Sequence, residues 1–150
     1  MAFAEKKTAG PMMSVERVGE LEIRTERDIL AARHTVRDAA AELGFATTEI
    51  TRIVTAASEL ARNVFKYAGE GTMRWSCVAE DERAGLELEF SDRGPGIQDL
   101  ELALSEGFST GGGLGMGLPG AKRLVDEFEI QSAPGEGTRV VLRKWRRKLR

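Results

Sequence analysis

Glycines gather in the second half of this 150-residue chain, around residues 94–96 and in the segment 107–117 (GFSTGGGLGMG). Glycine lets backbone N–H groups approach a ligand closely, so a glycine-rich loop that leads into a helix is suited to hold phosphate. Residues 115–120 also match the G-x-G-x-x-G pattern, but no predicted strand precedes them and no βαβ unit surrounds them. The segment is therefore either a phosphate-binding loop or a glycine-rich surface loop without a ligand.

Glu59 and Asn63 lie four residues apart on a predicted helix and so share one of its faces. Both interrupt an apolar stretch, where a carboxylate must be solvated by a cleft or paired. The amide oxygen of Asn63 suits a hard cation such as Mg²⁺. The alternative is structural: Glu59 forms a surface pair with Arg62 or Lys66, and Asn63 bonds to the backbone.

Asp92 ends a predicted strand and is followed by Arg93-Gly94-Pro95-Gly96-Ile97. These residue types are common in turns, which is one interpretation of the segment. A carboxylate held at a strand end can also accept a hydrogen bond from an exocyclic amine, while the glycines allow a flat base to lie against the backbone. This geometry favours adenine over guanine, because the guanine carbonyl would face the carboxylate oxygens with no proton between them.

Hydrophobic periodicity indicates the elements that position these groups. Thr25 and Asp28 form a weak capping box before a first helix. Thr47 or Thr48 is expected to cap a second, largely buried helix that runs to Ala68. The other predicted elements are strands at 14–24, 72–79, 86–90, 129–133 and 138–145, a short helix at 98–104, a loop at 107–117 and a helix at 118–128.

This order of elements predicts an α+β fold: a two-layer α/β sandwich with helices on one face of a mixed, mostly antiparallel sheet. Residues 1–13 are expected to form a flexible leader, residues 14–145 the domain, and residues 146–150 a basic tail.

The amino-acid composition excludes several classes of protein. The chain is 41% hydrophobic and 31% charged with a formal net charge of −2, which is typical of one globular cytoplasmic domain and argues against a membrane protein. Cys77 and His34 are single residues of their type, so any metal must be oxygen-bound, and His34 is expected to be an exposed helix residue. Seven basic residues at 139–150 indicate a solvated or protein-docking end rather than a nucleic-acid site, because the only aromatic among them is Trp145.

Four segments, read in order, resemble the ATP-site boxes of the GHKL superfamily, which includes gyrase, Hsp90, histidine kinases and MutL. They are E-L-A-R-N (59–63), D-R-G-P-G-I (92–97), G-G-G-L-G-M-G-L (111–118) and G-E-G-T (135–138). Within the superfamily, residues 20–145 resemble most the small bacterial anti-sigma-factor serine/threonine kinases, in particular the RsbT-type switch kinases of the stressosome. The stretches SELARN, YAGEG and GGLGMGLPGAKRLVDEF carry this resemblance. It implies a GHKL ATP-binding kinase domain with the Bergerat-type sandwich.

The resemblance also implies a role for each matching residue. Glu59 would be the general base or orienting group for the acceptor hydroxyl, and Asn63 would ligate the Mg²⁺ that bridges the phosphates of ATP. Asp92 would hold the adenine amine. The remaining cofactor-binding positions would be Lys66 beside the phosphates, Gly94, Gly96 and Ile97 in the base pocket, Thr138 nearby, and Gly113, Leu114, Gly115, Met116, Gly117 and Leu118 in the lid and phosphate cradle.

One departure from the group concerns the lid. Some of these kinases carry an arginine just before the last lid glycines, whereas here no basic residue lies between Arg93 and Lys122. Charge stabilisation would then be weaker or supplied by the partner, as with an arginine finger donated in trans. We therefore expect a slow, partner-dependent kinase.

The function implied by the resemblance is that of an ATP- and Mg²⁺-dependent serine/threonine-protein kinase in a bacterial partner-switching pathway. It would phosphorylate a STAS-domain antagonist or scaffold protein and, once released, bind a PP2C-type phosphatase. The alternative is a nucleotide-gated binding protein, such as an anti-sigma factor that binds a sigma factor or a phosphatase activator, with little or no catalysis. A bare ATPase is a third possibility.

Overall fold

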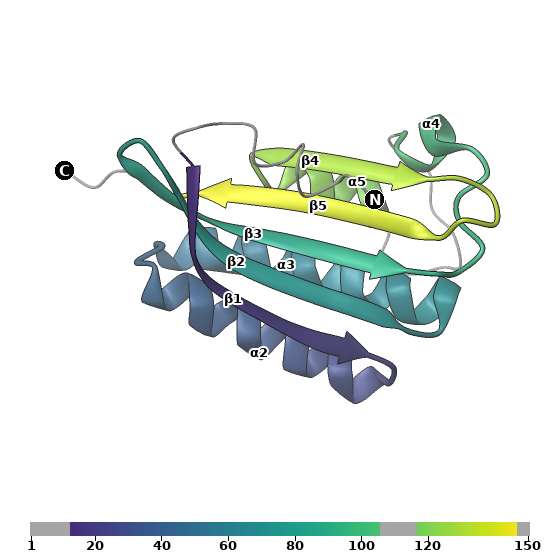
Figure 1. Cartoon of the computed structure of the whole chain (residues 1–150), viewed down its shortest axis with the longest axis horizontal. Helices are drawn as coiled ribbons and strands as arrows, with labels where there is room; N and C mark the ends of the chain where they lie inside the picture. The colour runs from purple at the N-terminus through teal and green to yellow at the C-terminus, as the bar shows by residue number, and fades with distance from the viewer. Residues whose placement is uncertain (1–12, 106–116, 147–150) are drawn as a thin grey trace.

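The computed structural model describes residues 13–105 and 117–146, which form two layers (Figure 1). One layer is a five-stranded sheet of order β1-β2-β3-β5-β4, and the other holds α2, α3 and α5. The strands are β1 (Met13–Ile23), β2 (Gly71–Glu80), β3 (Arg83–Asp92), β4 (Glu127–Ser132) and β5 (Thr138–Trp145). The helical elements are α2 (Glu26–Glu42), α3 (Thr47–Asn63), η1 (Val64–Ala68), α4 (Leu100–Ala103) and α5 (Gly117–Arg123).

The predicted fold class is confirmed: helices cover one face of a largely open sheet, in the predicted order along the chain (Figure 1). Every strand pair among the described residues is antiparallel, so the sheet there is antiparallel rather than mixed. The predicted leader, glycine-rich loop and basic tail lie outside the described residues, except for Met13, Gly117 and Arg146.

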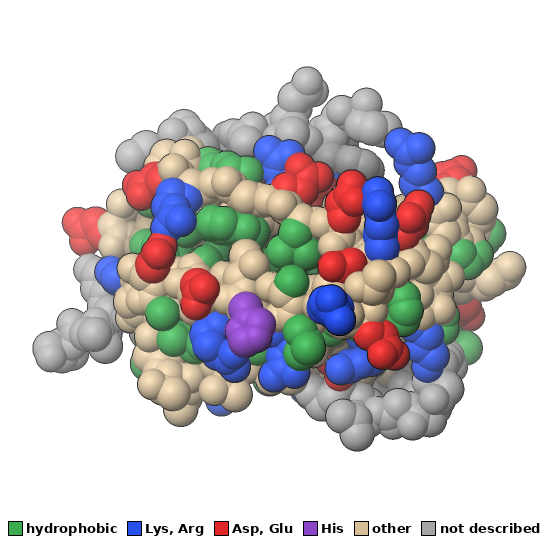
Figure 2. All heavy atoms as spheres, turned by 90° about the horizontal axis from the view of Figure 1, so that it is seen from below, with side chains coloured by type: hydrophobic (Ala, Val, Ile, Leu, Met, Phe, Trp, Pro, Cys, Tyr) green, Lys and Arg blue, Asp and Glu red, His purple; other side chains and the backbone are tan. Residues whose placement is uncertain are grey.

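The capping box that starts α2 is confirmed. The Thr25 hydroxyl accepts a hydrogen bond from the Asp28 N–H at 3.3 Å, and the Asp28 carboxylate accepts one from the Thr25 N–H at 3.0 Å. The carboxylate also accepts a hydrogen bond from the Arg24 N–H at 2.8 Å, and this bond is the main cause that lowers the pKa of Asp28. Farther along α2, His34 is exposed as predicted, and it forms the purple patch of Figure 2.

The prediction that Thr47 or Thr48 caps α3 is wrong. The capping residue is Ala46, and no side chain makes a capping hydrogen bond there. The preceding Phe45 is buried and its N–H bonds to the carbonyl of Ala40, so the chain enters the helix one residue earlier than the hydroxyl pattern indicates. The expected burial of α3 is confirmed, because seven of its residues are buried: Ile53, Val54, Ala56, Ala57, Ser58, Leu60 and Ala61.

The helix predicted at 118–128 is too long. α5 ends at Arg123, and Phe128 lies in β4, where it pairs with β5. The N–H of Asp126 bonds to a carbonyl of β5 at 3.0 Å, which brings the chain to the sheet edge. Leu124 and Val125 pack against the core from the connecting turn. Their helical spacing therefore reflects burial from two different elements, not one helical face.

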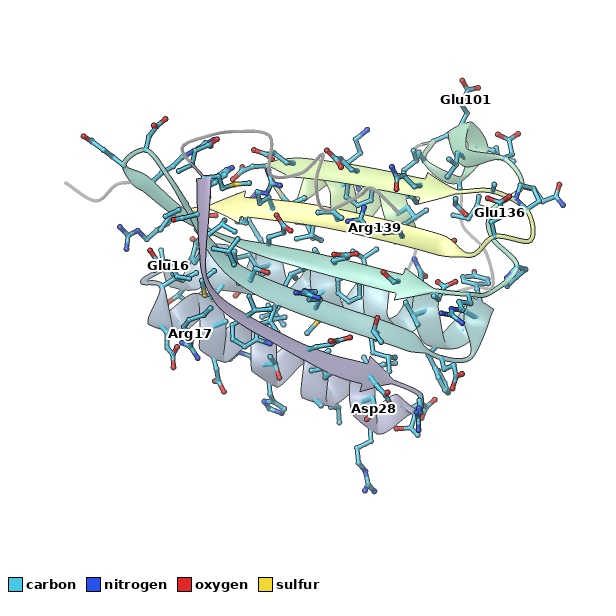
Figure 3. The ribbon with its side chains drawn as sticks, viewed as in Figure 1. Glu16, Arg17, Asp28, Glu101, Glu136 and Arg139 are labelled. Atoms are coloured by element: carbon cyan, nitrogen blue, oxygen red, sulfur yellow. The ribbon has the colours of Figure 1, made fainter. Side chains whose placement is uncertain are left out.

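The basic residues of β5 are paired within the domain, which corrects their assignment to a solvated or docking end. Each of the three is held by at least one ion pair: Arg139 Nε lies 2.6 Å from Glu89 Oε2, Arg143 Nε 2.9 Å from Glu87 Oε1, and Lys144 Nζ 2.9 Å from Glu49 Oε1. Arg139 lies on the sheet in front of the helical layer (Figure 3). Because these charges are already neutralised, a basic docking end rests on residues 146–150 alone.

The core lies between the sheet and the helical layer. Its largest fully buried side chains include Phe90, Ile53, Leu60, Met73 and Leu142, which come from both layers.

Among residues 13–105 and 117–146, no helix is both long and apolar enough to cross a membrane.

Candidate functional site

A cavity of about 580 Å³ opens where the end of α3 and η1 face the end of β3 and the start of α5. Its volume is that of a small-molecule or cofactor site. The predicted site residues that line it are Glu59, Asn63, Lys66, Asp92, Gly96, Ile97, Gly117, Leu118 and Thr138. Gly94 lies outside the lining, beside Asp92, and Gly113, Leu114, Gly115 and Met116 fall outside the described residues.

Much of the cavity wall is apolar. Leu60 and Val64 contribute from the helical layer, Phe90 and Val140 from the sheet, and Pro119 from α5. An apolar wall of this kind can cover a flat base, while a few polar groups set its orientation.

Asp92 is the polar group at the end of β3. Its Oδ1 accepts a hydrogen bond from the Gly94 N–H at 2.8 Å. Burial raises the pKa of the Asp92 carboxyl above its ordinary value, and hydrogen bonds from the backbone N–H groups of Gly94 and Thr138 oppose that rise. Gly94 has to be glycine, since a Cβ there would lie 2.6 Å from the Cβ of Ala68. The carboxylate therefore sits in a turn packed directly against η1.

The loop after Asp92 is fastened to the turn between β4 and β5. The Ile97 N–H donates to the Ser132 hydroxyl at 2.8 Å, and that hydroxyl in turn lies 2.9 Å from the Gly137 carbonyl and 2.8 Å from the Thr138 hydroxyl. Gly96 has a φ of +78°, and a Cβ there would meet the Ala133 carbonyl oxygen. Two glycine-containing segments about 40 residues apart in the chain thus form one rigid wall of the cavity.

Ser132 was not selected from the sequence, because a serine at the end of a strand carries no local signal of a distant partner. We expect Ser132→Ala to lower the free energy of unfolding by about 1–3 kcal/mol, since the Ile97 N–H would lose its acceptor. Thermal or urea unfolding measures this, with the exposed Ser14→Ala in β1 as the matched control. A change no larger than that of the control would show that the hydroxyl does not hold the loop.

Glu59 and Asn63 line the cavity one helical turn apart, as predicted. The Glu59 side chain is only 12% exposed, and its Oε2 lies 3.2 Å from Nη1 of Arg62. The pairing with Arg62 that was considered as a structural alternative is therefore present, but both partners line the cavity rather than a plain outer surface. The ion pair between Glu59 and Arg62 is therefore part of the cavity wall.

The helix changes character immediately after Asn63. Residues Val64–Ala68 form η1, a single π-helical turn, where the sequence indicates a continuous helix to Ala68. Single π turns of this kind occur frequently at functional sites. Lys66 lies on η1 with Nζ 5.3 Å from the centroid of the Tyr67 ring.

Tyr67 and Leu102 are two lining residues that sequence reasoning missed. Tyr67 is 47% exposed and Leu102 is 50% exposed, so both border the cavity from the outside. The spacing of four residues from Asn63 could have indicated Tyr67. Leu102 lies on the short α4, and no motif connects it to the other site residues.

Comparisons with known proteins show which family this chain is similar to. Residues 48–148 match the family described as histidine kinase-, DNA gyrase B-, and HSP90-like ATPases. The chain is 52% identical over 125 residues to the serine/threonine-protein kinase RsbT of Bacillus subtilis, which covers 83% of this chain and 94% of that protein. It is 34% identical over 120 residues to an anti-sigma F factor of Caldanaerobacter subterraneus, which covers 76% of this chain and 82% of the relative.

A solved structure shares the fold. The RsbU and RsbW domains of a Mycobacterium tuberculosis protein align over 87% of this chain with a TM-score of 0.58 and 23% sequence identity. The aligned part is 33% of that solved chain, so this chain spans about a third of its length.

The match to the ATPase family extends over most of the chain, and the identity to RsbT extends over nearly all of that relative. Both confirm the resemblance carried by the four sequence boxes, and the family implies that ATP is the nucleotide used. The chain belongs to the histidine kinase-, DNA gyrase B- and HSP90-like ATPase family and, within it, to the RsbT-type serine/threonine-protein kinases.

Proposed function

We propose that this protein is a cytoplasmic kinase that transfers the terminal phosphoryl group of ATP to a serine or threonine of a STAS-domain antagonist or scaffold protein. Once released from that protein, it would bind and activate a PP2C-type phosphatase in a bacterial partner-switching pathway. The observation that carries the proposal is that Asp92, Glu59 and Asn63 line one cavity in a chain 52% identical to a serine/threonine-protein kinase.

The order of groups along the cavity supports ATP as the ligand. Ala68 packs beside the Asp92 turn, and Glu59 lies nine residues earlier on the same continuous helical segment. At 1.5 Å per residue this separation is roughly 13 Å, the scale of a nucleotide with its phosphates. The adenine amine would therefore bind at Asp92, while the phosphates extend toward Asn63, Glu59 and the start of α5.

The donor set fits Mg²⁺ held jointly by protein and nucleotide. Among residues 13–105 and 117–146, no group of three or more His, Cys, Asp or Glu side chains could hold a metal ion by itself. Mg²⁺ commonly uses one or two protein oxygens together with substrate phosphates and water. We assign the side-chain oxygen of Asn63, which lines the cavity, as such a ligand, and the bound ion would neutralise charge on the phosphates.

The transfer needs little covalent chemistry from the protein. The acceptor hydroxyl oxygen forms a bond to the terminal phosphorus, and the bond from that phosphorus to the bridging oxygen breaks, leaving its electron pair on ADP. The hydroxyl proton passes to Glu59 late in the step, because the hydroxyl is too weakly acidic to ionise first. The roles of this chain are therefore to position the two oxygens and to stabilise charge.

The proposal is tested by incubating the protein with ATP, Mg²⁺ and STAS-domain proteins encoded near it. Intact mass is expected to show one added phosphoryl group on one of them, dependent on both ATP and Mg²⁺. Brisk ATP hydrolysis without any partner, and no labelled protein, would instead favour a bare ATPase.

The similarity to anti-sigma F factors supports a second candidate function, in which nucleotide binding alone controls a partner protein. The variant Glu59→Ala separates the two. If Glu59 accepts the proton, phosphoryl transfer is expected to fall by about 10²–10⁴-fold while ATP still binds. Signalling that continues unchanged in cells carrying Glu59→Ala would favour the nucleotide-gated binding protein.

A further inference from the structure

Arg62 lies at the catalytic end of the cavity, between the two residues to which the family resemblance gives roles. It follows Glu59 by three residues and immediately precedes Asn63 on α3. Its side chain is 46% exposed, yet it lines the cavity and reaches back to place Nη1 3.2 Å from Glu59 Oε2. A guanidinium at this boundary can turn either toward Glu59 or toward the cavity.

The charges around the cavity single out Arg62. The described lining residues include two cations, Arg62 and Lys66. Lys66 lies on η1, where its Nζ packs 5.3 Å from the Tyr67 ring centroid, one turn closer to the Asp92 end. The other walls consist of residues 90, 92, 95–99, 102–103, 117–119, 138 and 140, and none of these described lining residues is a lysine or arginine. Arg62 is therefore a lining cation that directly contacts Glu59 and is adjacent to Asn63 in the chain.

We propose that Arg62 exchanges partners during the reaction: it holds the Glu59 carboxylate while no nucleotide is bound, and it turns to the terminal phosphate once ATP occupies the cavity. This proposal rests on the proposed function for the location of the phosphates. It makes Arg62 a catalytic residue supplied by the kinase itself, in place of the lid arginine that the chain lacks and of a finger donated by the partner.

Two physical arguments support the exchange. A mostly buried carboxylate needs a cation or hydrogen-bond donors, and Arg62 supplies this to Glu59 in the nucleotide-free protein. Once Arg62 turns away, the Oε2 atom of Glu59 that it contacts becomes open to the acceptor hydroxyl. The phosphates of ATP are a stronger attraction for the planar five-donor guanidinium than a single carboxylate. ATP binding would thus free Glu59 and place a cation on the transferred group in one movement.

Nucleotide discrimination tests the contact with the terminal phosphate without any kinase assay. In calorimetry with Mg²⁺, Arg62→Ala is expected to weaken a non-hydrolysable ATP analogue about tenfold or more and ADP less than about twofold. Arg62→Lys keeps the charge and should recover part of the difference. Arg52→Ala is the matched control, because Arg52 is an exposed α3 residue outside the cavity lining. Equal losses for the two nucleotides, or no loss, would overturn the proposal.

A double-mutant cycle on thermal unfolding tests whether Arg62 pairs with Glu59 in the nucleotide-free protein. Without nucleotide, Arg62→Ala is expected to lower the Tm by about 2–4 °C, and Glu59→Gln in the same chain should restore most of it. With the saturating ATP analogue, this coupling between the two positions is expected to disappear. A coupling of the same size with and without the analogue would show that Arg62 never leaves Glu59.

These measurements separate the role of Arg62 from the proposed kinase function. If no STAS-domain protein is phosphorylated but Arg62→Ala still weakens the ATP analogue far more than ADP, the substrate assignment fails and the role of Arg62 stands. If transfer to a STAS-domain protein is found and Arg62→Ala lowers its kcat by less than about threefold, the role of Arg62 fails and the kinase assignment stands.

Discussion

Replacing Asn63 with Ala is expected to lower the rate of phosphoryl transfer by about 10²–10³-fold, the cost of removing one group that stabilises charge in the transition state. Asn63 is the last residue of α3 and lines the cavity one turn from Glu59. In the proposed function, the side-chain oxygen of Asn63 would hold the metal ion together with the phosphates. The measurement is single-turnover transfer at saturating ATP over a range of Mg²⁺ concentrations.

A second variant at position 63 keeps an oxygen ligand and serves as the control for Asn63→Ala. Asn63→Asp does so with an added negative charge, and it is expected to retain Mg²⁺-dependent ATP binding where Asn63→Ala loses it. Circular dichroism and the Tm of both variants establish that α3 and η1 still form. Activity of Asn63→Ala within a few-fold of the parent, with the same Mg²⁺ dependence, would remove this residue as a metal ligand.

The variant Asp92→Asn is expected to weaken ATP binding by about 10–100-fold, the range of a hydrogen bond to a charged group. The parent protein is expected to prefer ATP to GTP for the same reason, since adenine presents an amine to the carboxylate where guanine presents a carbonyl oxygen. Calorimetry with both nucleotides measures the two effects. Equal affinity of the parent for ATP and GTP would contradict the assignment of Asp92 to the base.

The raised pKa of Asp92 adds a pH dependence with opposite signs for binding and for stability. Binding of the adenine amine requires the ionised carboxylate, so ATP affinity is expected to fall as the pH drops through the raised pKa, and Asp92→Asn should remove this dependence. Folding favours the protonated form, because the folded pKa lies above the unfolded one. The stability that Asp92 contributes is therefore full below the unfolded pKa and is lost as the pH rises through the folded pKa. Nucleotide-free Asp92→Asn is thus expected to be at least as stable as the parent at neutral pH.

Local sequence patterns predicted the structure correctly where residues close together in the chain determine it. The capping box of Thr25 and Asp28 forms as predicted because both partners lie within one turn. Asp92 lies at the end of its strand as the alternating pattern of residues 86–90 indicates. The same rules failed at Thr47 and Phe128, where a buried neighbour or a strand pairing outweighs local propensity.

The sequence did not distinguish two roles for Glu59, a surface ion pair with Arg62 and a functional carboxylate in a cleft. An ion pair with Arg62 and a place in a catalytic cavity predict the same residue types at the same spacing. The structure combines the ion pair with a place in a cavity, because the helix turn that carries the pair faces a cavity whose other walls come from β3, β5, α4 and α5. Spacing reports which residues share a face, but not what lies opposite that face.

Periodicity and short motifs act within a few residues, so the element order, the two-layer class and the motif residues could be predicted from the chain. Three features depend on packing between distant segments: β4 in place of the end of a helix, the bond from Ser132 to the loop at Ile97, and the position of Arg62 at the cavity. The bond from the Ile97 N–H to Ser132 joins positions 35 residues apart. Contacts of that range depend on how whole elements pack against one another, and no local pattern in the chain records the outcome of that packing.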